Sequence, residues 1–181
     1  STMGKIAPCC EFDDELGNTT ETSMKEVWQG AATAELQRQF LAGETPEGCW
    51  KCVERDQTEG MSLRQKSNLR FPKWVNRFQA DLGKEMVLPK SPVTLDIRFS
   101  NLCNFKCRSC WHGSSSKWFS DALKLGLTAG TSAEIRSFQD VEDMASQFAP
   151  MISNLEEIYF AGGEPILMAE HYRLLELLIE Q

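Results

Sequence analysis

Two short apolar segments, each followed by a loop and an amphipathic segment, constrain the fold of this chain more than any other feature. Residues 93–99 place apolar side chains at alternate positions, and residues 156–161 form a second apolar run. Helical spacing of apolar residues follows in segments 138–148 and 172–179. Strand, loop and helix, repeated twice, predict a parallel α/β sheet, in which loops after the carboxyl ends of the strands build the site.

Both predicted strands are followed by an unusual loop. The first loop, CNFKCRSC, holds Cys103, Cys107 and Cys110, and the second loop is GGEP at residues 162–165. A structural zinc site is closed and four-coordinate, and a [4Fe–4S] cluster normally takes four thiolates. Three protein thiolates would leave one iron free for an exogenous ligand.

GGEP alone is also a reasonable turn at the end of a strand.

A zinc site is the alternative for the first loop. The nearest fourth ligand is His112, which would give the spacing C-x3-C-x2-C-x-H. Such tight spacing leaves little chain to wrap a tetrahedral ion, so the open three-thiolate site is the preferred interpretation.

The seven cysteines are better interpreted as metal ligands than as a disulfide framework. Seven is an odd number, and no secretory signal opens the chain. At 41 % apolar and 25 % charged residues the chain has the composition of a globular protein, and no apolar run approaches the roughly 18 residues of a membrane span. We therefore expect a reducing, cytoplasmic setting without membrane attachment.

Net charge argues against a nucleic-acid partner. The chain carries a net charge of −7, whereas phosphate binding needs a clustered basic surface. Residues 71–110 are the exception, with 7 basic and 3 acidic side chains. Within them, Lys106 and Arg108 either offset the negative charge of a thiolate-bound cluster or are solvated loop residues.

The first 70 residues have a different pattern. A short strand is expected at residues 3–7, and a single helix is expected to begin after Ser23, with Glu26 completing a capping box, and to end at Gly43. Its buried face is expected to hold a set of apolar residues that comprises Val27, Ala31, Ala34 and either Phe40 or Leu41. Residues 71–92 look like a connector with a short helix between Pro72 and Gly83, and we place a domain boundary near residue 88.

CNFKCRSC and GGEP, each following a strand and lying about 50 residues apart, resemble the radical S-adenosylmethionine (SAM) superfamily and its CxxxCxxC signature. The resemblance implies that Cys103, Cys107 and Cys110 hold a [4Fe–4S] cluster whose free iron binds SAM. It also implies that the methionine amino group of SAM is hydrogen-bonded by the stretch Gly162, Gly163, Glu164 and Pro165.

The same resemblance implies an oxidoreductase-type reaction. An electron from a donor such as flavodoxin or ferredoxin would cleave SAM to methionine and a 5′-deoxyadenosyl radical, which takes a hydrogen atom from the substrate. One departure concerns the residue before the third cysteine, which is usually apolar in the family and is Ser109 here. Trp111 or Phe105 could supply that apolar surface, and each could equally be a core residue.

The stretches GKIAPCC, LGNTTETSMKEVWQG and LAGETPEGCWKC resemble the auxiliary-cluster modules called SPASM and twitch domains. This resemblance implies a second [4Fe–4S] cluster on Cys49, Cys52 and one or both of Cys9 and Cys10, with Cys10 preferred. A fourth ligand is expected upstream of Ser1, so we expect the chain to be part of a longer protein. The alternative is a zinc knuckle on the same thiols, with Cys49 and Cys52 at a turn.

The sequence thus predicts an α/β chain with residues 1–88 as a small α+β iron–sulfur domain and residues 89–181 as the start of a partial (β/α) radical SAM barrel. The substrate stays open among peptides or proteins, carbohydrates and small metabolites, with peptides or proteins preferred, and no catalytic side chain is assigned. The alternatives are a non-catalytic zinc or iron–sulfur electron-transfer protein and a truncated relative that binds clusters without reacting.

Other polar residues have simpler expectations. Asp96 or Arg98, on the polar face of the first strand, could line a substrate cavity. We expect His171 to be an exposed residue at the start of a helix, and Glu156 and Glu157 to be solvated loop charges.

Overall fold

The computed structural model describes residues 1–58, 60–81, 89 and 91–180. The strands are β1 (Lys5–Ile6), β2 (Gly17–Asn18), β3 (Thr94–Ile97) and β4 (Glu157–Phe160). The α-helices are α1 (Met24–Trp28), α2 (Ala31–Leu41), α3 (Trp50–Asp56), α4 (Leu63–Arg70), α5 (Pro72–Asp81), α6 (Phe119–Lys124), α7 (Val141–Phe148) and α8 (Ala169–Ile179). Four 3₁₀ turns are η1 (Glu47–Cys49), η2 (Ser116–Trp118), η3 (Ala149–Met151) and η4 (Pro165–Leu167).

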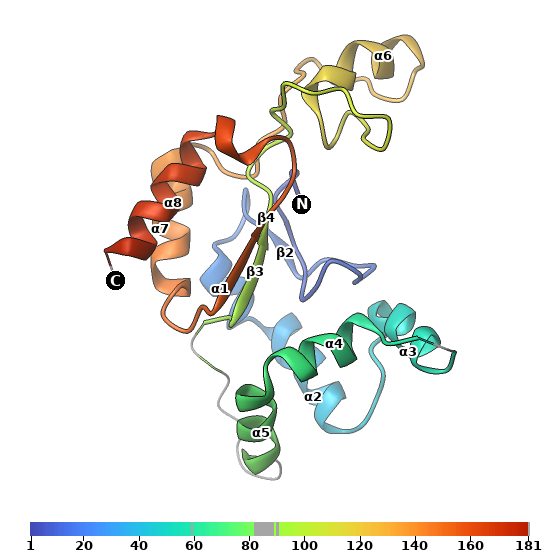
Figure 1. Ribbon diagram of the computed structural model, residues 1–181, viewed down its shortest axis with the longest axis vertical. Helices are drawn as coiled ribbons and strands as arrows, with labels where there is room; N and C mark the ends of the chain where they lie inside the picture. The colour runs from blue at the N-terminus through green and yellow to red at the C-terminus, as the bar shows by residue number, and fades with distance from the viewer. Residues whose placement is uncertain (59, 82–88, 90, 181) are drawn as a thin grey trace.

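Strands β3 and β4 pair in parallel, as the sequence pattern predicts. Their register places Leu95 beside Ile158 and Ile97 beside Phe160. Helices α7 and α8 pack against each other and cover one face of this pair (Figure 1). In the part of the chain that the structure describes, the sheet has only these two strands, so it forms an open α/β layer and not a closed barrel.

The core lies between β3, β4 and helices α7 and α8. Its centre is a group of aromatic side chains, in which the rings of Phe138 and Phe148 are 5.7 Å apart and those of Phe99 and Phe148 are 6.5 Å apart. The buried apolar residues that surround them are Ile97, Met144, Ile152, Met168 and Leu174. The alternating apolar positions of the first strand therefore do face the core, because successive side chains of a strand point to opposite faces.

The expected single helix after Ser23 is wrong, because it is two helices. The capping box that starts it is present: the Ser23 hydroxyl accepts from the Glu26 N–H at 3.3 Å, and the Glu26 carboxylate accepts from the Ser23 N–H at 3.0 Å. The chain then turns at Gly30, whose extended backbone begins α2. The break separates the faces of the two helices, so Val27 is buried while Ala31 and Ala34 are exposed.

Helix α1 and the β1–β2 hairpin pack directly against the βα layer. The Gln147 side chain in α7 donates to the Thr19 carbonyl at 3.2 Å and accepts from the Met24 N–H at 3.3 Å. The Ser137 hydroxyl donates to the Ser1 carbonyl at 2.8 Å. The expected domain boundary near residue 88 lies outside the described residues and stays a prediction.

Helix α5 begins at Pro72, as expected for a proline in a first helical turn, and its expected end at Gly83 lies outside the described residues. The Trp28 indole donates to the Pro89 carbonyl at 2.9 Å, which ties the end of the connector to α1. None of the helices described here is long and apolar enough to cross a bilayer.

Candidate functional site

The two unusual loops meet at the carboxyl ends of β3 and β4. The Gly163 N–H donates to the Ser114 carbonyl at 3.0 Å, and the Glu164 N–H donates to the Leu102 carbonyl at 2.7 Å. Leu102 precedes the cysteine loop (residues 103–110) and Ser114 follows it. The GGEP loop (residues 162–165) therefore holds both ends of the cysteine loop through backbone hydrogen bonds.

This contact requires the two glycines. Gly162 and Gly163 have φ of 74° and 61°, a region that glycine enters without steric cost. A Cβ atom on Gly163 would lie 2.2 Å from the Leu102 carbonyl oxygen, and a Cβ atom on Gly162 would lie 2.8 Å from Cβ of Arg98. Glycine is therefore needed here both for the backbone conformation and for the close approach of the two loops.

Asn101 connects the cysteine loop to the segment that follows it. Its side chain is fully buried and donates to the carbonyls of His112 at 2.7 Å and Ala133 at 2.9 Å. Its side-chain oxygen accepts from the Ile135 N–H at 2.8 Å. One amide thus fixes the end of the cysteine loop against residues 133–135, and its position in the sequence gave no signal for this role.

The polar segment after the cysteine loop folds back over it. The buried Ser115 hydroxyl donates to the Phe105 carbonyl at 2.7 Å, and the Ser116 hydroxyl accepts from the Cys103 N–H at 3.3 Å. The Trp118 indole donates to the Cys107 carbonyl at 2.9 Å. These contacts order the loop backbone without using any thiol.

Lys106 has a defined partner. Its ammonium group forms an ion pair with Asp121 in α6 and lies 4.7 Å from the centre of the Trp118 ring. The hydrogen bond from Lys106 holds the pKa of the Asp121 carboxyl below its usual value. Lys106 is therefore a paired residue, whereas Arg108 is exposed and has no ion-pair partner in the described part of the chain.

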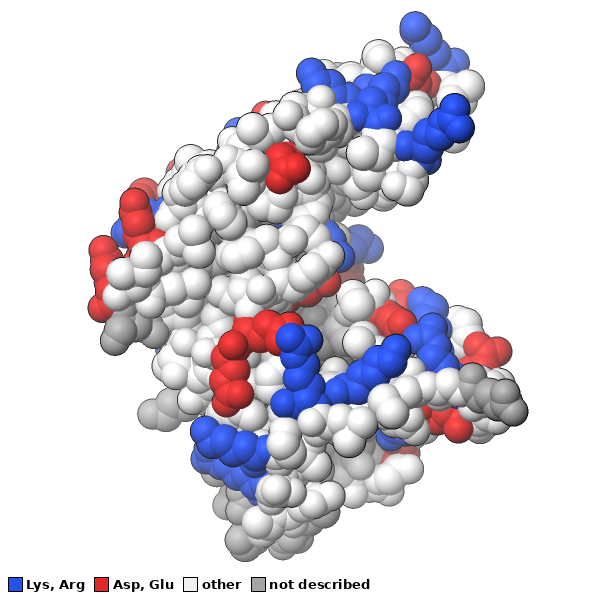
Figure 2. Space-filling model, in the orientation of Figure 1, with Lys and Arg blue, Asp and Glu red and all other residues white. Residues whose placement is uncertain are grey.

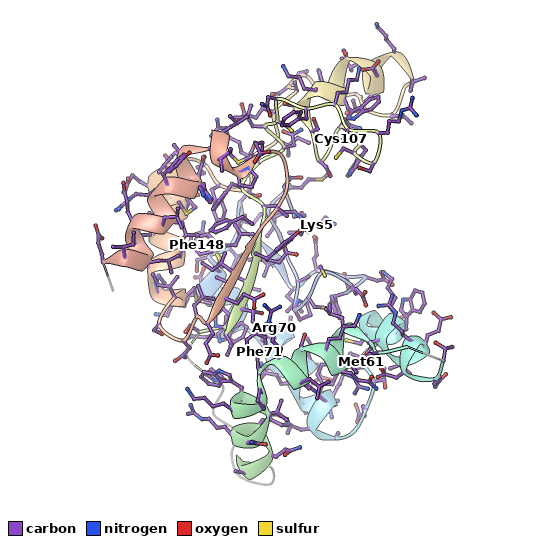
Figure 3. All side chains as sticks on the ribbon, in the orientation of Figure 1. Lys5, Met61, Arg70, Phe71, Cys107 and Phe148 are labelled. Atoms are coloured by element: carbon purple, nitrogen blue, oxygen red, sulfur yellow. The ribbon has the colours of Figure 1, made fainter. Side chains whose placement is uncertain are left out.

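The three thiols of the cysteine loop lie at its accessible surface. Cys107, labelled in Figure 3, is exposed. Cys103 and Cys110 are half-buried, and all three are free cysteines. The Phe105 N–H donates to the Cys103 sulfur at 3.4 Å, which fixes the position of that side chain against the loop backbone. Across the described residues no three His, Cys, Asp or Glu side chains converge with metal-ligand geometry. The loop thus supplies thiolate donors of the right type on a backbone that other residues hold in place.

The residues around the loop are open to a ligand. The Glu164 carboxylate is half-buried and has no hydrogen-bond or ion-pair partner among the described residues. Phe105 and Trp111 are 55 % and 52 % exposed, so neither is a core residue. Ser109 is exposed as well.

A second group of thiols lies in the first 53 residues. The segment after Cys10 contacts the turn and helix that carry Cys49 and Cys52. Glu11 forms an ion pair with Arg55 at 2.9 Å. The Asp13 carboxylate accepts hydrogen bonds from the Trp50 indole and the Lys51 ammonium group. The Asp13 N–H also donates to the Gly48 carbonyl at 3.3 Å. The acidic stretch after the vicinal cysteines therefore brings them toward Cys49 and Cys52. Cys49 ends the 3₁₀ turn η1, as expected for a cysteine at a turn, and Cys52 lies in the helix α3 that follows it.

Cys9 interacts with both cysteines of the C-x-x-C. Although Cys9 is exposed as a residue, neighbouring atoms desolvate its thiol and raise its pKa, and the charges of Cys10 and Cys52 raise it further. Desolvation also raises the pKa of Cys49, followed by the charges of Cys9 and Cys52. Cys9, Cys49 and Cys52 therefore lie in the same region of this segment, although no three metal-ligating side chains converge there among the described residues. The preference for Cys10 as the ligand is not tested by these contacts.

Three other expectations need comment. Glu156 and Glu157 are not merely solvated, because Glu156 accepts from the Trp74 indole at 2.6 Å and Glu157 forms an ion pair with Arg70 at 2.5 Å. His171 is half-buried and not exposed, since its ring lies 4.5 Å from that of Phe160.

Asp96 and Arg98 pair with each other at 3.0 Å, and Arg98 packs beneath Gly162. Arg98 therefore contributes to the GGEP loop, although no cavity is described at this ion pair.

Comparison with known families finds one match, in the segment that holds the second group of thiols. Residues 1–53 match the family model SPASM, an iron–sulfur cluster-binding domain. No curated protein and no solved structure matches the chain. The match covers the segment with Cys9, Cys10, Cys49 and Cys52, so the family of this segment is supported and the cysteine loop of residues 103–110 lies outside it.

The close approach of Gly163 to Leu102 predicts the effect of a single methyl group. In Gly163→Ala the new Cβ meets a backbone carbonyl, so the free energy of unfolding should fall by more than the about 1–2 kcal/mol that a left-handed residue costs. Gly43→Ala is the matched control, because Gly43 has φ of 73° and nothing within 4 Å of an added Cβ. Urea denaturation measures the free energy of unfolding of both variants. Equal losses of stability would show that the two loops can move apart without cost, and would contradict the role given to their close approach.

The hydrogen bonds of Asn101 predict a loss of order in the cysteine loop. Asn101→Asp keeps the shape of the side chain but removes both donors and buries a charge, so stability should fall by about 3 kcal/mol or more. Amide hydrogen exchange at residues 103–112 should also become faster. Asn104→Asp, at an exposed position of the same loop, should change neither quantity appreciably. Unchanged exchange at residues 103–112 in a folded Asn101→Asp protein would contradict the role given to Asn101.

Proposed function

We propose that this protein is a radical SAM enzyme with an auxiliary iron–sulfur cluster. The observation that carries the proposal is the direct contact between the GGEP loop and the cysteine loop at the carboxyl ends of two parallel strands. A turn that merely ended β4 would have no need to contact the backbone on both sides of a three-thiol loop.

The residues at this contact supply the types of donor that the two groups of the proposal require. Cys103, Cys107 and Cys110 would hold a [4Fe–4S] cluster and leave one iron for SAM. Gly163 would let the backbone of the loop approach the methionine part of SAM. The Glu164 carboxylate, which has no partner among the described residues, would accept a hydrogen bond from the ammonium group of SAM. When bound and reduced by one electron, these groups supply a 5′-deoxyadenosyl radical and methionine. The chain's own residues hold SAM in register with the thiols and keep the loop ordered before SAM binds.

The SPASM match supports the auxiliary cluster. Cys49, Cys52 and one or both of Cys9 and Cys10, with Cys10 preferred, would be its ligands. Its role would be to accept an electron from a product radical, to bind substrate or to stabilise the fold. For the substrate we propose a peptide or protein, and for the location the cytoplasm, where the thiols stay reduced.

A non-catalytic iron–sulfur or zinc protein is the second candidate. The SPASM match by itself is compatible with it, because that match concerns residues 1–53 alone. Such a protein would have no use for an open Glu164 carboxylate beside the cysteine loop. The backbone hydrogen bonds between the GGEP loop and the residues that flank the cysteine loop therefore favour the enzyme over the non-catalytic protein.

The test of the enzyme is cleavage of SAM. After anaerobic reconstitution with iron and sulfide, the protein should produce 5′-deoxyadenosine from SAM when dithionite is added, and Cys107→Ala should lose this activity because the cluster loses a ligand. Ser109→Ala is the matched control in the same loop and should retain it. Absence of 5′-deoxyadenosine from the wild type, or equal amounts from Cys107→Ala, would refute the proposal, and stoichiometric zinc without iron uptake would favour the second candidate.

The test of the auxiliary site is iron content. In a background that carries Cys107→Ala, a further Cys10→Ala substitution should remove more of the remaining iron than Cys9→Ala, because Cys10 is the preferred ligand. Iron is measured by a colorimetric assay after reconstitution. The opposite ranking would assign the ligand to Cys9, and no loss of iron in either variant would contradict an auxiliary cluster on these thiols.

A further inference from the structure

Helices α4 and α5 form a basic surface on a protein that is otherwise acidic. Residues 62–80 contain five basic side chains and no acidic one, although the whole chain carries a net charge of −7. All five are exposed, and Figure 2 shows lysine and arginine side chains gathered where these two helices lie. We call this region the α4–α5 surface; its basic residues are Arg64, Lys66, Arg70, Lys73 and Arg77.

The two helices are held in a fixed orientation. Only Phe71 separates the end of α4 from the start of α5. The Trp74 indole donates to the Glu156 carboxylate at 2.6 Å, and Arg70 forms an ion pair with Glu157 at the start of β4. The α4–α5 surface is therefore attached to the βα layer, and its side chains keep their arrangement before a partner binds.

Intramolecular ion pairs neutralise only part of the positive charge. Arg64 pairs with Asp56, and Arg70 pairs with Glu157. Because no residue between 62 and 80 is acidic, neither helix offers its own cations an ion-pair partner. Lys66 has no ion-pair partner among the residues that the structure describes. The surface thus keeps a local positive field, which attracts and orients a negative partner.

Aromatic rings lie beside these cations. Lys73 and Arg77 are four residues apart and share one side of α5. The Lys73 ammonium lies 5.5 Å and the Arg77 guanidinium 5.6 Å from the centre of the Trp74 ring. The Arg70 guanidinium lies 5.9 Å from the centre of the Phe71 ring. Aromatic and arginine side chains together are enriched in protein–protein interfaces.

Exposed apolar side chains complete the α4–α5 surface. Leu69 is 68 % exposed and Phe78 is 41 % exposed. Helix α4 has no buried residue, so its apolar side chains are not used in a core. Leu69 lies one helical turn from Lys66, and Phe78 lies one turn from Trp74. Apolar area is therefore interspersed with positive charge along both helices.

We propose that the α4–α5 surface is the docking site for an acidic, amphipathic helical segment of a partner protein. The carboxylates of that segment pair with Lys66, Lys73 and Arg77, and its apolar side chains cover Leu69 and Phe78. Charge complementarity speeds the encounter and sets its orientation, and burial of apolar area stabilises the complex. The inference is independent of the proposed function, because none of these residues belongs to the cysteine loop, the GGEP loop or the second group of thiols.

A nucleic acid and a membrane also bind basic surfaces, but the α4–α5 surface suits them less well. The affinity of a nucleic acid comes from neutralising many phosphates, and two of the five cations here are already paired with carboxylates. An interfacial membrane helix needs a continuous apolar face, whereas Leu69 and Phe78 lie on different helices. A helical segment with spaced carboxylates needs only a local field and a small apolar contact, so the distribution of charge and apolar area favours it.

The first test compares two charge reversals of equal size. The probe is a fluorescently labelled 20-residue peptide in which glutamate and leucine recur at helical spacing, and its binding to the full chain is measured by anisotropy at low salt. Lys66→Glu/Lys73→Glu should bind this peptide at least about tenfold more weakly, and added salt should weaken wild-type binding. Lys25→Glu/Lys124→Glu reverses two exposed lysines on α1 and α6 and should bind like the wild type.

The second test removes apolar area and leaves the charge unchanged. Leu69→Ser should weaken binding of the peptide several-fold, because the peptide's leucines lose a contact. Leu127→Ser is the matched control, since Leu127 is 65 % exposed and lies outside the α4–α5 surface. Thermal unfolding confirms that each variant folds, and if the charge reversal does not fold, the leucine pair and the salt dependence decide.

Several outcomes would overturn the inference. One is equal affinity of the two charge-reversal variants for the acidic peptide. Another is that a peptide with lysine in place of every glutamate binds the wild type as tightly. Tighter binding of a 20-nucleotide RNA or of phosphatidylserine vesicles, lost in Lys66→Glu/Lys73→Glu, would assign the surface to a nucleic acid or to a membrane instead.

Discussion

The parallel pairing of β3 with β4 is the constraint on which the rest of this site depends. Because Ile97 lies opposite Phe160, both strands end at the same edge, and the loops that follow them have to share one space. The two loops fit because Gly163 lacks a Cβ atom and can approach the Leu102 carbonyl. The backbone N–H of Glu164 donates a hydrogen bond to the same carbonyl at 2.7 Å. A hydrophobic core of Phe99, Phe138 and Phe148 beneath the strands fixes that edge, so the contact between the loops follows from how the strands pack.

The cysteine loop is ordered by neutral polar side chains and one ion pair, and this has an energetic consequence. Asn101 and Ser115 are fully buried, and each satisfies backbone groups that the loop cannot pair within itself. The hydrogen bonds that form during folding thus offset the conformational entropy lost when the loop becomes ordered. This entropy is then not lost again when a ligand binds. A preformed loop of this kind binds a cofactor with less loss of free energy than a mobile loop of the same composition.

The sequence predicted the elements whose residues repeat with a period. The apolar alternation ending at Phe99 marked β3, and the i, i+4 leucines marked α8. It did not predict the role of residues 112–137, because side-chain to backbone hydrogen bonds from Asn101 and Ser115 have no period to detect. The break at Gly30 was missed because a glycine inside a helical pattern is often tolerated. The ion pair between Glu157 and Arg70 joins two segments that are far apart in the sequence. A local pattern along the chain carries no information on which distant segments come together.

The first residues of the chain connect the two groups of thiols. Thr2 is buried; its hydroxyl donates to the Gly113 carbonyl at 2.7 Å, and its methyl group lies against Gly162. It thus contacts the segment after the cysteine loop and the GGEP loop at once. Cys9 is the seventh residue after Thr2, and seven residue steps span at most about 25 Å when the chain is fully extended. The hairpin of β1 and β2 fixes its course. The SPASM segment is therefore anchored on the GGEP loop and on the segment that follows the cysteine loop.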